Sequence, residues 1–557
     1  MVFNINLFNY FVYNQFGGKK NNESKWRTFS HDGVLFPSPY KAHLVPLIYD
    51  GKKIILDSES EEYATIYATF LNTDYLNNRI FKKNFFNDWK IYLKKSGFNE
   101  INDFTKCDFK LIYDHILLHR ESKKKLSKEE KEKIKNERDN FEKKYKVAIV
   151  DGKKQLVGNF RIEPPGIFLG RGCHPKAGKI KKRIFPEDIT INIDNNSPIP
   201  NLPSFYKTHK WGKIIHDNTL EWLASWKDTI TGKIKYVWLG AKSDFKAKSD
   251  LNKFEIARKL KNKINFIRKI NFENIISPSV DNKTKQLASA LYLIDNLALR
   301  VGNEKGEDEA DTVGVCSLRI EHINFLDDNK IKLDFLGKDS VRYVRTVKID
   351  VNVYKILLQF IRNKNKTDDL FELITPTTLN IYLKSMMDDL TAKVFRTYNA
   401  SNLFQNEILN INENFDTYKE NDKINILLDM YNKANVKVAM LCNHQKTVSK
   451  SFNDQIIKFA EKINELNEKR KELLKDKKKN KDKIKKNDLK IKDLKNKRNL
   501  KIELKNLSLT TSKTNYIDPR ITIAFLKYHN IPIEKIFSTA LRDKFFWAID
   551  VDKDWIF

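Results

Sequence analysis

Residues 330–349, KIKLDFLGKDSVRYVRTVKI, constrain the fold more than any other stretch of the chain. Two runs of apolar and β-branched residues flank the polar segment GKDS, and this pattern predicts a β-hairpin. On both sides of it, across residues 254–443, apolar residues such as Leu287, Leu291 and Ile294 recur at helical spacing. We therefore expect a helical core with one inserted hairpin.

The region before this core follows a different pattern. Between residues 25 and 250, short aromatic and apolar runs alternate with turn signals, which predicts a mixed α+β unit. Ser127 and Glu130 have the spacing of a capping box at the start of a strongly charged helix. Later, a stretch rich in Gly, Pro and basic residues precedes TGKIKYVWLG, which alternates like a strand. Basic loops on a small sheet are expected there.

The region after the core is dominated by lysine. Residues 447–509 carry only a thin apolar stripe, including Ile463 and Leu466, and then a second stripe after KDKKKNKDK. Two helices that fold back on each other through a charged tip fit this pattern, as in a coiled-coil arm. A disordered basic linker is the open alternative. Beyond it, Asp518 and Pro519 mark the start of a helix in a compact helical module.

The predicted fold class is α+β multidomain, because 557 residues exceed what one core usually holds. The predicted segments are a short tail at 1–24, a mixed lobe at 25–250, a mainly helical lobe at 251–446, the arm at 447–509 and a C-terminal domain at 510–557.

The charge balance favours a polyanionic partner. The chain has 103 Lys and Arg against 72 Asp and Glu, a net charge of +31. Nucleic acid fits this balance better than a membrane surface does, and no apolar run approaches the length of a membrane span. The four cysteines form no CxxC pair, which argues against a zinc ribbon or a disulfide framework. They are Cys107, Cys173, Cys316 and Cys442.

Two patterns that could indicate a cofactor are weak. GRGCHPKAGK, residues 170–179, resembles a phosphate loop, but Cys173 replaces its first glycine and no Ser or Thr follows Lys179. A cluster of carboxylates in a polar stretch is more often a solvated loop than a metal site. Its members are Glu304, Glu307, Asp308, Glu309 and Asp311. We expect neither a nucleotide cofactor nor a metal.

The segment SKTNYIDPR, residues 512–520, resembles the active-site signature of eukaryotic type IB topoisomerases. Further strings match the same family in the same order. LALRVGNEK contains Arg300, DFLGKDSVRY contains Lys338, LTAKVFRTYNAS contains Arg396, and LCNHQK contains His444. The resemblance runs from about Trp26 to the C-terminus. It implies an enzyme that cuts one DNA strand with Tyr516, lets the duplex swivel and reseals it without metal or ATP.

Physical chemistry agrees with the roles that the resemblance assigns. A phosphodiester attacked by a phenol gains negative charge on its non-bridging oxygens, which Arg300, Arg396 and His444 can stabilise. His444 can do so protonated or as an N–H tautomer. The departing 5′-oxygen is a poor leaving group, so an acid must protonate it, and Lys338 at the hairpin tip is the candidate. No general base stands beside Tyr516 in the sequence.

The resemblance implies further properties. Residues that contact DNA or support the site would be Arg171, His174, Asn303, Asp339, Thr511 and Asn515. Double-stranded DNA would be the partner of a monomer that resides in the nucleus. The mixed lobe would clamp as a cap on the catalytic lobe. Leu169 departs from the family, in which many relatives carry Arg before the GRG motif, and residues 1–24 replace a long charged tail.

Two other functions could explain the same residues. A tyrosine recombinase uses similar residues, but recombinases normally show HxxR at the second arginine, where this chain has Lys393 followed by Val, Phe and Arg396. A non-catalytic DNA-binding protein is the second rival, and the presence of all five candidate catalytic residues argues against it.

Overall fold

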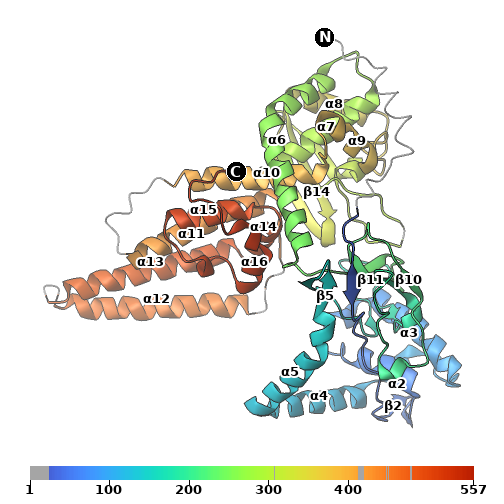
Figure 1. Ribbon diagram of the computed structural model, residues 1–557. Coiled ribbons are helices and arrows are strands. Elements are labelled where there is room, and N and C mark those ends of the chain that lie inside the picture. Colours follow the sequence, from blue (N-terminus) through green and yellow to red (C-terminus); the bar gives the residue numbers. More distant parts are fainter. Residues whose placement is uncertain (1–23, 307, 412–419, 447, 449–450, 477–478) are drawn as a thin grey trace. The chain divides into compact units, whose positions relative to one another are not determined.

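The computed structural model describes residues 24–306, 308–411, 420–446, 448, 451–476 and 479–557. They divide into two compact units. The first contains the described residues up to Ser249 together with 308–310, and the second contains the rest. Helices and several small sheets occur together, as the predicted mixed class requires (Figure 1). The predicted tail, apart from Ser24, lies outside the described residues.

The first unit contains four small sheets. One has the strand order β1-β5-β6 and another the order β10-β9-β11-β12. The remaining two are β3-β2-β4 and the pair β7-β8. The strands are β1 (Phe29–His31), β2 (Leu47–Tyr49), β3 (Lys52–Ile54), β4 (Cys107–Asp108), β5 (Val147–Val150), β6 (Lys153–Leu156), β7 (Gly166–Ile167), β8 (Ile180–Lys181), β9 (Ile189–Asn192), β10 (Lys213–Ile215), β11 (Trp222–Lys227) and β12 (Ile234–Trp238).

Four helices accompany these sheets. They are α2 (Ser58–Ala68), α3 (Arg79–Lys95), α4 (Lys110–Lys125) and α5 (Lys128–Glu142). An aromatic cluster holds α2 against α3, with the rings of Tyr67 and Phe85 stacked 4.3 Å apart. The predicted capping box of α5 is confirmed, because Glu130 N donates to Ser127 Oγ at 3.0 Å and Ser127 N donates to Glu130 Oε2 at 2.7 Å.

The second unit is mainly helical. Its helices are α6 (Asp244–Ile276), which begins in the first unit, α7 (Asn282–Leu297), α8 (Val351–Phe360), α9 (Pro376–Met386), α10 (Ala392–Leu409), α11 (Glu420–Leu441), α12 (Phe452–Leu474), α13 (Lys481–Glu503), α14 (Leu509–Asn515), α15 (Pro519–Tyr528) and α16 (Thr539–Lys544). Its one sheet among the described residues has the order β13-β14-β15. These strands are β13 (Ile323–Leu326), β14 (Lys330–Gly337) and β15 (Val341–Lys348).

The predicted hairpin is therefore β14 and β15, and a third strand extends it. In β14, Ile331, Leu333 and Phe335 are buried while their neighbours are not, so alternate side chains face the core. One continuous core joins this sheet to α7, α8, α10 and α15. Tyr516 packs against the same core. The hairpin tip and the C-terminal helices are thus fixed to a single framework.

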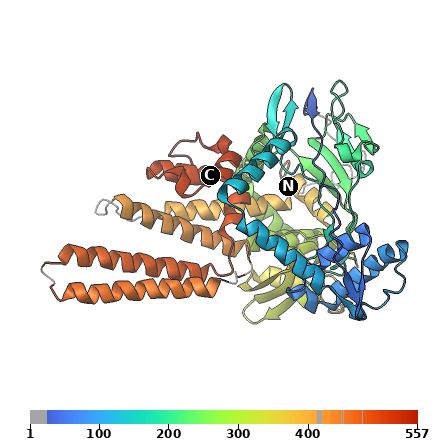
Figure 2. The ribbon, with the colours of Figure 1, turned by 90° about the horizontal axis from the view of Figure 1, so that it is seen from below.

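Helices α12 and α13 lie side by side in both views (Figures 1 and 2). Ile463 and Ile491 are buried between mostly exposed charged residues. Asn487 donates its side-chain amide to the carbonyl of Leu466 at 2.7 Å, which ties the two helices together. The apolar stripe of this lysine-rich segment is thin, yet it lies between two paired helices.

None of the helices within the described ranges is both long enough and apolar enough to cross a membrane.

Candidate active site

A cavity of about 160 Å³ in the second unit gathers most of the predicted site residues. Its walls come from the end of α7, the tip of the β14–β15 hairpin, α10, the segment after α11, and α14. The predicted residues that line it are Arg300, Lys338, Asp339, Arg396, His444 and Thr511. Segments far apart in the sequence therefore meet at one site.

Backbone packing fixes the loop that carries Arg300. Helix α7 ends at Leu297, and its C-cap Ala298 has a left-handed φ of 49° that turns the chain sharply. Gly302 has a φ of +79°, and a Cβ there would lie 2.6 Å from the Cα of Gly314. The carbonyl of Arg300 accepts a hydrogen bond from Val315 N at 2.9 Å. This close approach holds the backbone while the Arg300 side chain stays exposed at the cavity.

Arg396 is buried on α10, with only 5% of its surface exposed. Its Nη1 donates to the carbonyl of Ala298, and its Nη2 donates to the carbonyl of Cys442 at 3.1 Å. Its Nε has no partner within the described residues. A guanidinium has five N–H groups. Two of them hold the side chain in place and a further bond goes to the Tyr516 hydroxyl, so Nε stays available to an anion in the cavity.

His444 follows α11 and is 4% exposed. Its Nδ1 lies 2.7 Å from Ser512 Oγ, whereas its Nε2 has no hydrogen-bond partner in the described part of the chain. Burial, and then the charges of Arg396 and Arg300, lower the pKa of His444 to about 3. Of the two protonation states that the sequence left open, the structure therefore favours the neutral imidazole.

Tyr516 is the C-cap residue that directly follows α14. Its ring lies 5.0 Å from the His444 ring in a stacked arrangement, and the Arg396 guanidinium lies 4.9 Å from its centre. Burial raises the pKa of the Tyr516 hydroxyl, but the charges and hydrogen bonds of Arg396 and Arg300 outweigh burial and bring the pKa below its ordinary value. The two arginines thus favour the phenolate, which is the nucleophilic form.

Lys338 lies at the tip of the hairpin, in the short 3-10 turn Lys338–Ser340. Asp339 and Ser340 have left-handed φ values of 69° and 57°, which close this turn tightly. The Lys338 ammonium is exposed and has no ion pair or hydrogen bond to any described residue. It is free to approach a ligand in the cavity.

The remaining predicted residues have different surroundings. Asn303 is exposed in the loop after Arg300, and Thr511 Oγ1 lies 2.9 Å from Ser508 Oγ. The carbonyl of Asn515 accepts a hydrogen bond from Lys253 Nζ at 3.3 Å, and its side chain is exposed.

Arg171 and His174 belong to the first unit, in the loop between β7 and β8. Arg171 is exposed, and its neighbour Gly170 has a left-handed φ of 66°. His174 Nδ1 accepts a hydrogen bond from Lys176 N at 3.0 Å, and the His174 ring packs edge-on against Phe168.

Two serines at the site were not predicted. Ser512 bonds to His444, and its carbonyl accepts the backbone N–H of Tyr516 at 3.0 Å. Ser401 Oγ donates to the carbonyl of Tyr516 at 3.0 Å and accepts from Asp518 N at 3.0 Å. The position of Ser512 four residues before Tyr516 was the available signal. Residues 509–515 form α14, which packs against α11, and Asn435 donates to its first carbonyl.

The acidic stretch is engaged in ion pairs. Asp311 pairs with Arg319 at 2.7 Å, and Asp308 pairs with Lys176 at 3.1 Å. Glu307 lies outside the described residues. Across the ranges that the structure describes, no group of three His, Cys, Asp or Glu side chains has the arrangement of a metal site.

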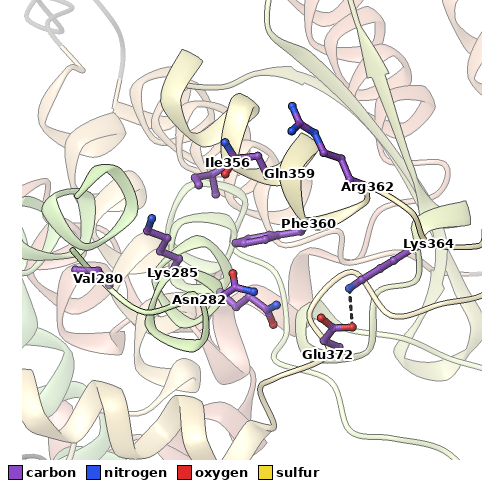
Figure 3. A pocket seen from close by; sticks show the side chains of 10 residues that line it. Val280, Asn282, Lys285, Ile356, Gln359, Phe360, Arg362, Lys364 and Glu372 are labelled. Carbon is purple, nitrogen blue, oxygen red and sulfur yellow. Dashed lines mark ion pairs between the residues drawn. The ribbon is translucent and has the colours of Figure 1, made fainter. Parts of the chain in front are cut away.

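A second cavity, of about 470 Å³, lies between the start of α7 and the end of α8 (Figure 3). Figure 3 shows Phe360 between Lys285 and Arg362, with Lys364 paired to Glu372 at 2.9 Å. Its lining includes none of the predicted site residues.

Comparison with known proteins gives matches along almost the whole chain. The model of the eukaryotic DNA topoisomerase I DNA-binding fragment matches residues 24–239. That of the eukaryotic DNA topoisomerase I catalytic core matches residues 242–477, and that of the C-terminal topoisomerase domain matches residues 488–557.

Curated relatives agree with these domain matches. DNA topoisomerase 1 beta of Arabidopsis thaliana is 44% identical over 96% of this chain and 60% of its own length. DNA topoisomerase 1 of Caenorhabditis elegans is 44% identical over 97% and 69%, and that of Homo sapiens is 41% identical over 96% and 72%. The chain spans about three fifths of the plant relative. By these matches, it belongs to the eukaryotic DNA topoisomerase I family.

Proposed function

We propose that this chain relaxes positive and negative supercoils in double-stranded DNA by cutting and resealing one strand. Tyr516 attacks a phosphodiester and forms a 3′-phosphotyrosine, the free 5′ end rotates, and the reverse reaction rejoins the strand. Neither metal nor ATP takes part. The observation that carries the proposal is the meeting of Arg300, Arg396, His444 and Lys338 beside a tyrosine whose pKa the two arginines lower.

Three side chains stabilise the charge that develops on the non-bridging oxygens. Arg396 keeps free N–H groups, including Nε, after its two bonds to carbonyls. Arg300 adds a second guanidinium from the exposed loop. His444, as a neutral ring, contributes a single N–H. Fixed donors in a largely buried site stabilise such a transition state without reorganising during the reaction.

Cleavage needs two proton transfers, one to the leaving group and one from the nucleophile. Lys338, from the hairpin tip, donates a proton to the departing 5′-oxygen. Tyr516 loses its proton to solvent, because Arg396 and Arg300 already stabilise the phenolate. A dedicated general base is therefore not required.

Residues outside the active site provide most of the binding to DNA. A net charge of +31 supports binding to the phosphate backbone. Residues 25–250 act as the DNA-binding cap and 251–446 as the catalytic lobe, while 447–509 connect the latter to a C-terminal domain at 510–557. Arg171, His174, Asn303, Asp339, Thr511 and Asn515 contact DNA or support the site. The enzyme works as a monomer in the nucleus.

The test is relaxation of supercoiled plasmid in EDTA without ATP. Tyr516→Phe removes only the nucleophilic oxygen, so binding to duplex should persist while relaxation and covalent trapping vanish. Tyr528→Phe, at an exposed tyrosine of α15, is the matched control and should relax DNA normally. Denaturant-trapped adducts that map to another residue, such as Tyr398, would overturn the assignment.

A further inference from the structure

The hydrogen bond between His444 Nδ1 and Ser512 Oγ has no role in the scheme above. The two atoms lie 2.7 Å apart, and both residues are buried, Ser512 completely. The opposite ring nitrogen, Nε2, is buried and has no partner among the described residues. The ring therefore has one nitrogen hydrogen-bonded to Ser512 and one without a partner beside the cavity.

Hydrogen-bond counting decides which nitrogen carries the hydrogen. A neutral imidazole has one N–H and one lone pair, and a serine hydroxyl can donate or accept. If Nδ1 carried the hydrogen, it would donate to Ser512. The Ser512 hydrogen would then have no acceptor among the described residues, and the Nε2 lone pair would have no donor. Two buried polar functions would be unsatisfied, which folded proteins avoid.

The other tautomer leaves fewer unsatisfied groups. When Ser512 donates to Nδ1, both of these atoms are satisfied, and only the Nε2–H lacks a partner. That N–H belongs to a ring that lines the same cavity as Arg300 and Arg396. An unpaired donor beside two guanidinium groups matches an anion such as a phosphate.

Ser512 also fixes the position of the nucleophile. Its carbonyl accepts the N–H groups of Tyr516 and Ile517, each at 3.0 Å. Its hydroxyl and its carbonyl thus join the His444 ring to the backbone at Tyr516. Because Ser512 lies on α14, His444 gains its partner only when α14 is docked against α11.

We propose that Ser512 is a positioning residue that donates a hydrogen bond to His444 Nδ1, holds the ring as the Nε2–H tautomer and so directs an N–H toward a non-bridging oxygen of the scissile phosphate. The proposal rests on the function proposed above for its last step. The tautomer itself can be measured without any reaction.

The first experiment is ¹⁵N NMR of the full-length protein with labelled histidine, with His444 assigned by difference from His444→Ala. We expect an unprotonated Nδ1 and a protonated Nε2 in the unsubstituted protein, and a mixture of tautomers in Ser512→Ala. A protonated Nδ1 in the unsubstituted protein would overturn the proposal. This holds even if Ser512→Ala does not fold, and even if the protein does not cut DNA.

The second experiment is a double-mutant cycle of single-turnover DNA cleavage. Ser512→Ala should slow cleavage by about 10-fold to 100-fold, on the scale known for removing the partner that orients a metal-bound histidine. In a His444→Ala background it should have almost no further effect. Ser289→Ala removes another completely buried serine hydroxyl and should leave the rate unchanged. Equal slowing by Ser512→Ala in both backgrounds would make Ser512 a structural residue and refute the proposal.

Discussion

Replacing Lys338 with alanine separates proton donation from charge stabilisation. Lys338 is exposed at the hairpin tip and bonds to no described side chain or carbonyl. Its removal should therefore change the free energy of unfolding by no more than roughly 0.5 kcal/mol, as for other surface substitutions. Loss of a general acid slows a reaction by about 10²- to 10⁴-fold. At about 1.36 kcal/mol for each factor of ten, the barrier should rise by roughly 2.7–5.4 kcal/mol.

The assay uses a substrate whose scissile 5′-oxygen is replaced by sulfur. A thiolate is a far better leaving group than an alkoxide and departs without a proton, so this substrate should restore most of the cleavage rate of Lys338→Ala. Arg300→Ala is the matched control, because its exposed side chain serves the non-bridging oxygens and should gain little from sulfur. Arg396→Ala is a poorer control, since it leaves two buried carbonyls without donors at about 1–3 kcal/mol each.

Two results would refute this reasoning. Equal rescue of Lys338→Ala and Arg300→Ala would remove the division of roles. Failure of sulfur to rescue Lys338→Ala would make Lys338 a charge stabiliser or a DNA contact.

Three further predictions concern the site and its support. Arg396→Ala should move the midpoint of the cleavage pH–rate profile to higher pH. With Arg300 left as the one guanidinium opposing burial, the pKa of Tyr516 rises and fewer molecules carry the phenolate. An unmoved midpoint would contradict this. Gly302→Ala should lower the melting temperature, with a destabilisation of about 1–3 kcal/mol, because the new Cβ would clash with Gly314 and residue 302 has a positive φ. An unchanged melting temperature would show that the loop relaxes. Deleting about 452–507 and adding residues 508–557 as a separate fragment should retain some cleavage, because α14 has its own contacts to α11. Binding of DNA without any cleavage at high fragment concentration would show that α12 and α13 position Tyr516.

Local sequence patterns determined several elements of this protein. Alternation in residues 330–349 predicted the hairpin, and Lys338 does lie at its tip. Ser127 with Glu130, and Asp518 with Pro519, marked helix starts that the structure contains. These signals work because each depends on backbone groups only a few residues away. The ordered family motifs supplied the identities of the candidate catalytic residues.

Tertiary structure alone decided how those residues act. His444 and Ser512 are 68 positions apart, and Arg396 reaches a carbonyl 98 positions away, so no local pattern encodes either contact. The neutral state of His444 and the lowered pKa of Tyr516 arise from burial and from two nearby guanidinium groups. Helix α14 shows the same dependence, because its seven residues gain their helical structure from packing on α11. Burial and long-range contacts are properties of the folded chain. They determine the pKa values and hydrogen-bond partners of side chains that the sequence identifies only as candidates.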